Sequence, residues 1–250
     1  MLRGLICGLL LGFASMAWAE TEHNTDEASG KIVILTTAIG TTLDAYLVGP
    51  ETAKKSVLIL HDRWGLDETA KIWADRFAAQ GYLALAVDLY DGRMAKKSDA
   101  EHASLIVSQI DPEWSVINVK AGISFLARKT GQKTAVLGWG FGGSLAFKAT
   151  QLGIESLASA VMLYGQLPTE LEELRKVTSP IFGVFSTSDE RLSIDELDQV
   201  GVLMGKLSNP FVSFEVNAAP GFVDQSLPVY DEDATELAWQ RSLEFLNGTL

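Results

Sequence analysis

The strongest constraint in the sequence is an alternation between short apolar runs and longer amphipathic stretches, which begins near residue 57. The apolar runs have the length of strands and no polar face, which is typical of strands buried on both sides. The predicted strands are residues 57–60, 82–87, 134–137, 158–163, 180–185 and 211–216, and the predicted helices are residues 67–80, 116–127, 143–151 and 195–206, with a last helix through Trp239, Leu243 and Leu246. This order predicts an α/β fold whose mostly parallel sheet is flanked by helices on both faces.

A β-hairpin is expected ahead of this alternation, with strands at residues 31–37 and 42–48 and a breaker pair, Gly49-Pro50, after it. The 250 residues are 47% hydrophobic, which is enough apolar material for a large core. Neither a repeat nor an internal linker interrupts the pattern. We therefore expect a single domain over residues 31–250.

The first nineteen residues have the layout of a secretory signal peptide. Arg3 precedes an apolar run over residues 5–13, and Ala17-Trp18-Ala19 stands before Glu20 as a small-residue cleavage site. A membrane anchor is the alternative, but a transmembrane helix needs about 20 apolar residues. We expect cleavage after Ala19, export to the periplasm or the medium, no stable membrane insertion, and a polar tail over residues 20–30.

The chain holds few residues that could carry out chemistry: one cysteine, Cys7, and three histidines, His23, His61 and His102. Signal cleavage would remove Cys7, so thiol chemistry is closed to the mature chain. No cluster of histidines and cysteines has metal-ligand spacing, and we expect no metal and no cofactor. The formal net charge of −12 opposes binding to nucleic acid.

The glycine-rich stretch at residues 138–143 follows a predicted strand and opens a helix. It matches the G-x-G-x-x-G dinucleotide fingerprint, but it lies in the middle of the chain and lacks the acidic residue expected about 20 positions later. A nucleophile elbow fits its position better, although Gly140 at the tip has no reactive side chain. A glycine turn that only permits tight packing is the third interpretation.

Several segments together resemble the dienelactone hydrolase family of α/β-hydrolases. They are Val57-Leu-Ile-Leu-His-Asp-Arg-Trp-Gly-Leu, Ala78-Ala-Gln-Gly-Tyr, Val87-Asp-Leu-Tyr, Leu137-Gly-Trp-Gly-Phe-Gly-Gly, Ser188-Asp189, and Tyr230-Asp231 with Glu236-Leu-Ala-Trp-Gln-Arg. The resemblance implies the α/β-hydrolase fold and a Cys-His-Asp triad that opens lactones or esters. The triad acid falls on Asp189, but the cysteine falls on Gly140 and the histidine on Pro220. An acidic residue that is usually glutamate falls on Asp62.

The order of residues along the chain leads to the same expectation. In α/β-hydrolases the base histidine follows the nucleophile and the acid, and this chain has no histidine after His102. We therefore expect a catalytically impaired or non-catalytic protein that binds a small molecule. The alternative is a hydrolase of small esters or lactones with a non-standard arrangement, such as a water activated by His61 or by the pair of Asp62 and Asp189.

Other residues near the predicted strand ends are candidates for the pocket. Arg63 and Phe141 would offer backbone N–H donors, Arg93 could meet a ligand carboxylate, and the remaining candidates are aromatic: Trp64, Tyr90, Trp139 and Phe222. Three serines, Ser144, Ser186 and Ser188, are expected to make local hydrogen bonds rather than act as nucleophiles. The ligand and the oligomeric state stay open.

Overall fold

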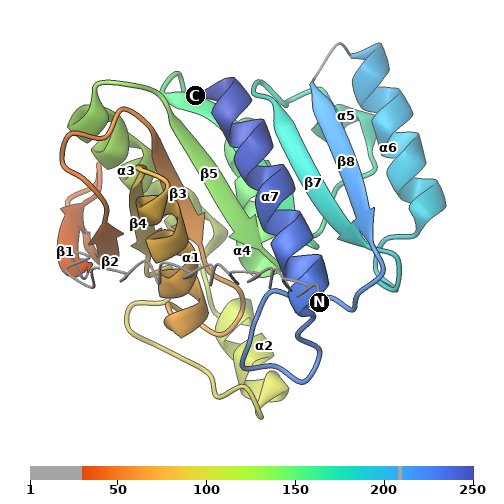
Figure 1. The fold of residues 1–250 in the computed structure, drawn as a ribbon, viewed down its shortest axis with the longest axis horizontal. Coiled ribbons are helices and arrows are strands. Elements are labelled where there is room, and N and C mark those ends of the chain that lie inside the picture. Colours follow the sequence, from red (N-terminus) through yellow and green to blue (C-terminus); the bar gives the residue numbers. More distant parts are fainter. Residues whose placement is uncertain (1–29, 208–209) are drawn as a thin grey trace, which may run out of the picture.

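The computed structural model describes residues 30–207 and 210–250, and within them eight strands form one sheet in the order β1-β2-β4-β3-β5-β6-β7-β8 (Figure 1). From β4 to β8 neighbouring strands are parallel, whereas β2 is antiparallel to β4 and β1 to β2. The strands are β1 (Lys31–Thr36), β2 (Thr42–Val48), β3 (Ser56–Leu60), β4 (Leu83–Val87), β5 (Thr134–Trp139), β6 (Leu157–Leu163), β7 (Ile181–Ser186) and β8 (Phe211–Val216). The predicted mostly parallel sheet is confirmed.

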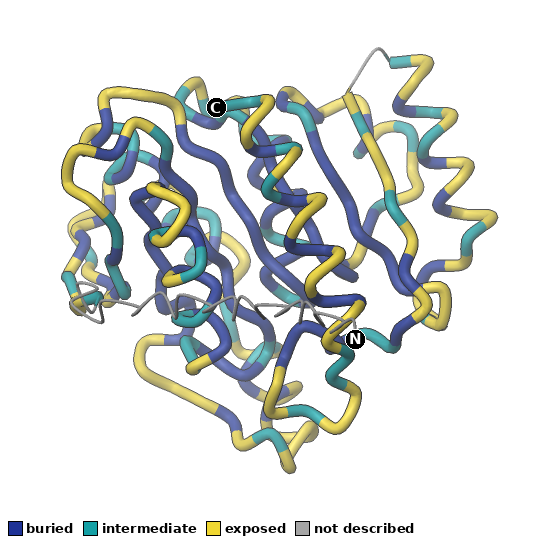
Figure 2. The backbone as a smooth tube through the Cα atoms, viewed as in Figure 1, coloured by how far each residue is buried: buried dark blue, intermediate teal, exposed yellow. Residues whose placement is uncertain are grey.

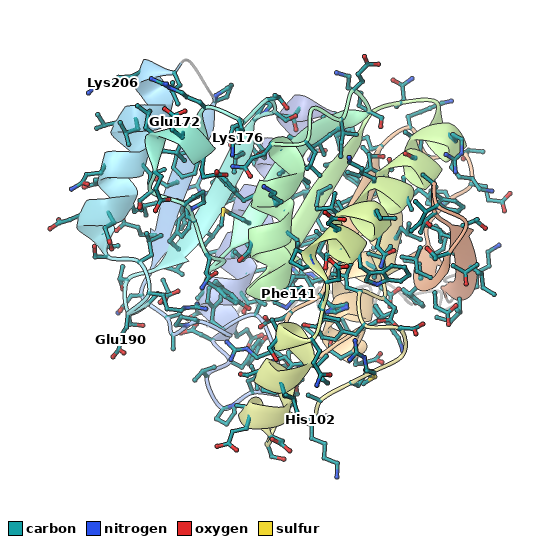
Figure 3. The ribbon with its side chains drawn as sticks, turned by 180° about the vertical axis from the view of Figure 1, so that it is seen from behind. His102, Phe141, Glu172, Lys176, Glu190 and Lys206 are labelled. Atoms are coloured by element: carbon teal, nitrogen blue, oxygen red, sulfur yellow. The ribbon has the colours of Figure 1, made fainter. Side chains whose placement is uncertain are left out.

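Helices cover both faces of this sheet, as predicted. The helices are α1 (Glu68–Ala79), α2 (Ala100–Ser108), α3 (Pro112–Thr130), α4 (Phe141–Thr150), α5 (Leu171–Leu174), α6 (Ile194–Lys206) and α7 (Glu232–Thr249). α1 and α7 lie in front of the sheet in Figure 1, while α3 and α4 lie in front of it in the reverse view of Figure 3. The central strands are buried along their length (Figure 2), which explains why they have no polar face.

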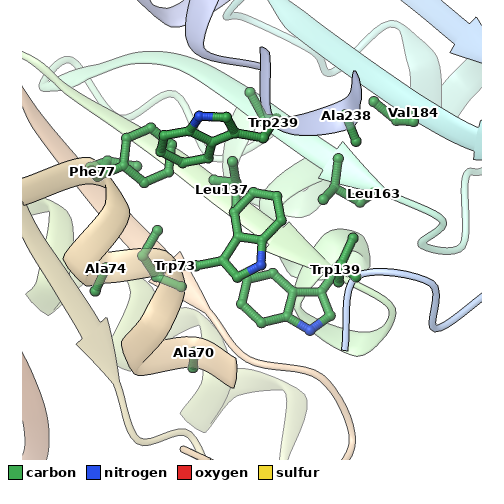
Figure 4. Close-up of a cluster of buried hydrophobic side chains, with 14 of the residues drawn as sticks. Ala70, Trp73, Ala74, Phe77, Leu137, Trp139, Leu163, Val184, Ala238 and Trp239 are labelled. Atoms are coloured by element: carbon green, nitrogen blue, oxygen red, sulfur yellow. The ribbon is translucent and has the colours of Figure 1, made fainter. Parts of the chain in front are cut away.

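The face under α1 and α7 holds a cluster of tryptophans (Figure 4). The ring of Trp73 from α1 lies 5.5 Å from that of Trp139 at the end of β5 and 5.6 Å from that of Trp239 on α7. Phe77 completes the cluster, 4.5 Å from Trp239. Because large aromatic side chains bury much apolar area, this cluster holds both helices on the sheet.

Local capping signals fix where the helices around the site begin. Asp67 caps α1 by accepting a hydrogen bond from the N–H of Ala70, and Ser193 with Glu196 forms a capping box at α6. α4 differs, because the residue before it is Gly140 and no side chain caps it. α4 begins at Phe141, two residues before the predicted start. The apolar pattern does not reveal that Phe141 and Gly142 already belong to the helix.

The predicted signal peptide lies outside the described residues, as does the polar tail except for Gly30. Among the helices that the structure does describe, none combines the length and the apolar character needed to cross a membrane.

Candidate functional site

The turn between β5 and α4 keeps the backbone conformation of a nucleophile elbow. Gly140 has φ +54° and ψ −116°, a conformation that favours glycine. Its neighbours are pressed against other chain segments: a Cβ atom added to Gly142 would lie 2.0 Å from the carbonyl oxygen of Leu60, and one added to Gly138 would lie 2.3 Å from that of Gly142. Close packing therefore fixes this turn even though no nucleophile stands at its tip.

The carboxylate of Asp62 occupies the space beside Gly140. Its Oδ1 atom accepts hydrogen bonds from the backbone N–H of Arg63 at 2.7 Å and of Phe141 at 3.0 Å. A Cβ atom on residue 140 would lie 2.1 Å from the same oxygen. In the α/β-hydrolase arrangement these two N–H groups would form the oxyanion hole. The predicted donors are thus present, but a carboxylate of the chain itself binds both.

Burial raises the pKa of the Asp62 carboxyl, and the hydrogen bonds from Phe141 and Arg63 offset part of this shift. Only 8% of the residue is exposed. No hydrogen bond from the described residues reaches its second oxygen, Oδ2. The carboxylate therefore presents one acceptor atom that the protein leaves open.

Asp189 lies at the carboxyl end of β7, where the family resemblance places the triad acid, but its carboxylate is paired. Arg191 holds it with two bonds, from Nε to Oδ1 at 2.8 Å and from a terminal guanidinium nitrogen to Oδ2 at 2.7 Å. The backbone N–H of Arg191 also donates to Oδ1. Burial alone would raise the pKa of Asp189, but the Arg191 contacts outweigh it and hold that pKa below its usual value.

Arg191 was not among the residues that the sequence singled out, because nothing in its local pattern distinguishes it from a solvated arginine. The structure places it in the cleft together with Asp62 and Gly140. It also donates to the backbone oxygen of Tyr164 at 3.3 Å. A guanidinium thus partners Asp189, the acid that would orient the base histidine in a complete triad.

A cleft with two arms surrounds Asp62, Arg63, Gly140 and Arg191 at the carboxyl edge of the sheet. The smaller arm, of about 200 Å³, is also lined by Trp64, Tyr164, Pro220, Gly221 and Leu227. The larger arm, of about 430 Å³, is also lined by Ser104, Val107, Ser108, Phe141, Ser144 and Gln166. Figure 3 shows Phe141 at the start of α4, on the side facing α2. The structure therefore brings Gly140 and Pro220, the positions where the family resemblance implies a cysteine and a histidine, into one arm.

His61 lies beneath this cleft and not in it. It is fully buried, with Nδ1 2.7 Å from the backbone oxygen of Asp62 and Nε2 accepting the N–H of Leu89 at 3.1 Å. Burial lowers the pKa of its ring, which is therefore neutral at pH 7. Both nitrogens already have backbone partners, so the geometry gives no support to the idea that His61 activates a water.

Three of the aromatic pocket candidates are core residues. Trp139 lies on the face of the sheet that α1 and α7 cover, where it packs on Trp73. Phe222 is fully buried, with its ring 5.1 Å from that of Tyr164. Tyr90 is buried between the rings of His61 and Phe141. The prediction that these three line the pocket is wrong, whereas Trp64 and Phe141 do line it.

Arg93 does not line either arm of the cleft. Its guanidinium donates to the backbone oxygen of Tyr90 and to the side chain of Gln109. The residue is exposed on the loop after β4. The predicted contact between Arg93 and a ligand carboxylate is therefore wrong for this cleft.

The three serines make local hydrogen bonds, as expected. Ser144 donates to the backbone oxygen of Gly140 and accepts the N–H of Gln166. Ser186 and Ser188 both bond to the carbonyl of Ala218. Within residues 30–207 and 210–250, no group of histidine, cysteine or acidic residues has a metal-binding arrangement.

A partly buried ion cluster beside the cleft connects three loops. Lys97, from the loop after β4, donates to the carboxylates of Asp67 and Asp224. Asp67 belongs to the loop after β3 and Asp224 to the loop after β8. The ammonium of Lys97 also lies 5.1 Å from the centre of the Trp64 ring, which lines the smaller arm. This cluster braces the wall of the cleft.

The sequence profile of the dienelactone hydrolase family matches residues 43–250, which span nearly all of the described fold. The chain belongs to the dienelactone hydrolase family. Two curated proteins are distant relatives of this chain. A protein of Saccharolobus solfataricus named "Putative carboxymethylenebutenolidase" is 25% identical over 245 residues, covering 83% of this chain and 94% of its own. "Protein usf" of Aquifex pyrophilus is 25% identical over 224 residues, covering 84% and 95%.

Among solved structures, the dienelactone hydrolase family fold recurs in a promiscuous phosphotriesterase described as dienelactone hydrolase-like, from metagenomic libraries. The TM-score is 0.74 at 18% identity, and the match covers 89% of this chain and 99% of the other. At that identity the similarity shows the fold alone, and the chemistry has to be argued from the cleft itself.

Proposed function

We propose that this protein is an exported dienelactone hydrolase family member that binds a small organic molecule in the cleft without the family's covalent chemistry. The observation that carries the proposal is the Asp62 carboxylate, which binds both backbone donors of the oxyanion hole next to Gly140. An ester carbonyl needs those donors for the negative charge that develops on its oxygen. Here it would meet a carboxylate instead.

The missing side chains support the same proposal. Covalent catalysis needs a nucleophile and a base, and the positions that would supply them hold Gly140 and Pro220. In a serine protease, loss of the nucleophile or the base alone removes a factor of about a million in turnover. The alternative from the sequence is a hydrolase in which Asp62 and Asp189 activate a water. Both oxygens of Asp189 are, however, bound by Arg191.

Turnover assays on the purified mature protein test the proposal. With p-nitrophenyl esters and lactones as substrates, we expect no rate above that of the buffer. Turnover that is clearly above the buffer rate and is lost in an Asp62→Asn or Asp189→Asn variant would overturn it. N-terminal sequencing of the protein from a fractionated host tests export, with Glu20 expected as the first residue.

Reconstruction of the triad is a sharper test, because the contacts of Asp62 and Arg191 predict which substitutions the reconstruction needs. Gly140→Cys with Pro220→His alone should give no esterase, since Asp62 fills the space of the new side chain and Arg191 holds Asp189. Adding Asp62→Ala and Arg191→Leu should free the hole and the acid, and raise p-nitrophenyl acetate turnover at least tenfold, or ~1.4 kcal/mol of barrier. Equal activity in the two-change and four-change proteins would show that Asp62 and Arg191 do not block the site.

A further inference from the structure

Because Asp62 binds the two N–H groups of the oxyanion hole, this part of the cleft presents a hydrogen-bond acceptor where the family arrangement presents two donors. In the family arrangement two N–H groups there receive an acceptor, such as the oxygen of an ester carbonyl. In this protein those N–H groups are bound to Oδ1 of Asp62, and Oδ2 is left without a partner among the described residues. The group that fits such a position is a hydrogen-bond donor, and a positively charged donor binds a carboxylate most strongly.

The side chain of Arg63 supplies a charge of the opposite sign at the same arm of the cleft. Its guanidinium forms no salt bridge or hydrogen bond with the residues that the structure describes, and its central carbon lies 6.0 Å from the centre of the Trp64 ring. The charge of Arg63 also acts on the Asp62 carboxylate, whose pKa it lowers. Arg191 also lines this arm, but Asp189 already neutralises it. The larger arm therefore offers one unpaired cation in addition to the open oxygen of Asp62.

The larger arm also has two apolar side chains, Val107 on α2 and Phe141 at the start of α4, among polar lining residues. Its volume of about 430 Å³ lies within the range of about 300–1,000 Å³ that is usual for small-molecule sites. Ser104 and Ser108 of α2 also line this arm. The arm thus combines an anion, a cation and an apolar surface in a space suited to one small ligand.

We propose that the larger arm binds a zwitterionic amino acid with an apolar side chain. Its ammonium group donates to Oδ2 of Asp62, its carboxylate pairs with the guanidinium of Arg63, and its side chain lies along Val107 and Phe141. This assignment rests on the proposed function, since it takes the cleft to be a binding site, and it adds the chemical class of the ligand. It differs from an ester or lactone substrate in requiring a donor where those substrates carry an acceptor.

Three related probes test the assignment by isothermal titration calorimetry on the purified mature protein at pH 7. L-Phenylalanine carries both charged groups, 3-phenylpropanoate lacks the ammonium, and 2-phenylethylamine lacks the carboxylate. L-Phenylalanine should bind, and each analogue should bind at least about tenfold more weakly. Equal affinity for either analogue, or no binding of L-phenylalanine at millimolar concentration, overturns the assignment.

Two variants connect the preferences to the residues. Asp62→Asn should abolish the preference for L-phenylalanine over 3-phenylpropanoate. Arg63→Gln should abolish the preference for L-phenylalanine over 2-phenylethylamine. Arg93→Gln is the matched control, because Arg93 is an exposed arginine of a neighbouring loop that does not line the cleft. It should bind all three probes as the unmodified protein does. Near-ultraviolet circular dichroism checks that each variant is folded, and preferences that persist in the folded Asp62 and Arg63 variants contradict the assignment.

The ester assay separates failure of this assignment from failure of the proposed function. If L-phenylalanine does not bind and no ester is turned over, the amino-acid assignment is wrong while the loss of covalent chemistry stands. Turnover that depends on Asp62 would instead overturn the proposed function and the amino-acid assignment together.

Discussion

The turn between β5 and α4 and the loop after β7 both lie at the carboxyl edge of the sheet, but different forces hold them. Backbone atoms of β3 press against the glycines of the turn, with only 2.0 Å between a Cβ atom on Gly142 and the oxygen of Leu60. The loop after β7 is held by a partly exposed ion pair between Asp189 and Arg191. Close packing of the backbone therefore holds the turn, whereas an ion pair between two side chains holds the loop.

This difference separates the part of the site that packing fixes from the part that a side-chain pair holds. A backbone conformation fixed by close packing can change only if the surrounding core changes with it. A side chain at the surface of a cleft can change with little effect on folding. Three measurements of stability test this difference between the turn and the loop.

The largest effect is expected for Gly142→Ala in the turn. The added methyl group would overlap the backbone oxygens of Leu60 and His61, neither of which can move without shifting β3. We expect a loss of about 3 kcal/mol or more in the free energy of unfolding, measured by urea denaturation.

Gly201→Ala in α6 is the matched control for that substitution. No atom lies within 4 Å of the added Cβ, and alanine is favoured over glycine in a helix by about 1 kcal/mol. The control should therefore be slightly more stable than the unmodified protein. A loss below about 1 kcal/mol for Gly142→Ala would mean that the turn is not held by packing.

An intermediate effect is expected for His61→Leu beneath the turn. The substitution leaves the N–H of Leu89 without its partner, which costs about 1–3 kcal/mol for a buried group. The carbonyl of Asp62 still accepts the N–H of Gly65 at 3.3 Å. Because the pKa of His61 is lowered in the fold, its neutral ring contributes stability above about pH 6.5 that is lost as the pH falls below that value.

Urea midpoints at pH 7.5 and pH 5.5 measure this second effect. The unmodified protein should lose more stability between the two pH values than His61→Leu does, since the variant has no ring to protonate on unfolding. Equal losses in both proteins would show that the ring is protonated in the fold, contrary to the buried neutral state described above.

The smallest effect is expected for Arg191→Gln in the loop. The arginine side chain is 42% exposed, so solvent screens the pair and we expect a loss of only about 0.5–1 kcal/mol. Because Arg191 holds the pKa of Asp189 below its usual value, this contribution is present at neutral pH and is lost as the pH falls below about 4. A loss as large as that of Gly142→Ala would erase the contrast between loop and turn.

Most of the fold could be predicted from the sequence, because buried strands such as β3 and β6 are short runs of apolar residues. The side of the sheet that each residue faces was harder to assign. Its position at a strand end predicts that Trp139 lines the pocket, although two-residue alternation puts it on the same face as Leu137, in the core. The α5 helix has only four residues, too few to show a helical pattern.

Gly140 and Pro220, the positions to which the family resemblance points, line the smaller arm because both follow strands of a fixed order, whereas Asp189 lines neither arm. The contacts of Asp62 and Arg191 could not be predicted in the same way. Asp62 accepts a hydrogen bond from the N–H of Phe141, which lies 79 positions later in the sequence, and its side chain could equally have faced solvent. Such contacts depend on the packing of two loops, which leaves no periodic signal in one chain.

The carboxylate beside Gly140 also bears on the evolutionary reversibility of the site. A cysteine restored at position 140 would collide with Asp62, and a histidine restored at position 220 would find its acid bound to Arg191. By this geometry no single substitution rebuilds the triad, so selection for esterase activity has no first step to favour. Under the proposed function, a return to the covalent chemistry of the family would therefore require several coordinated changes in the cleft.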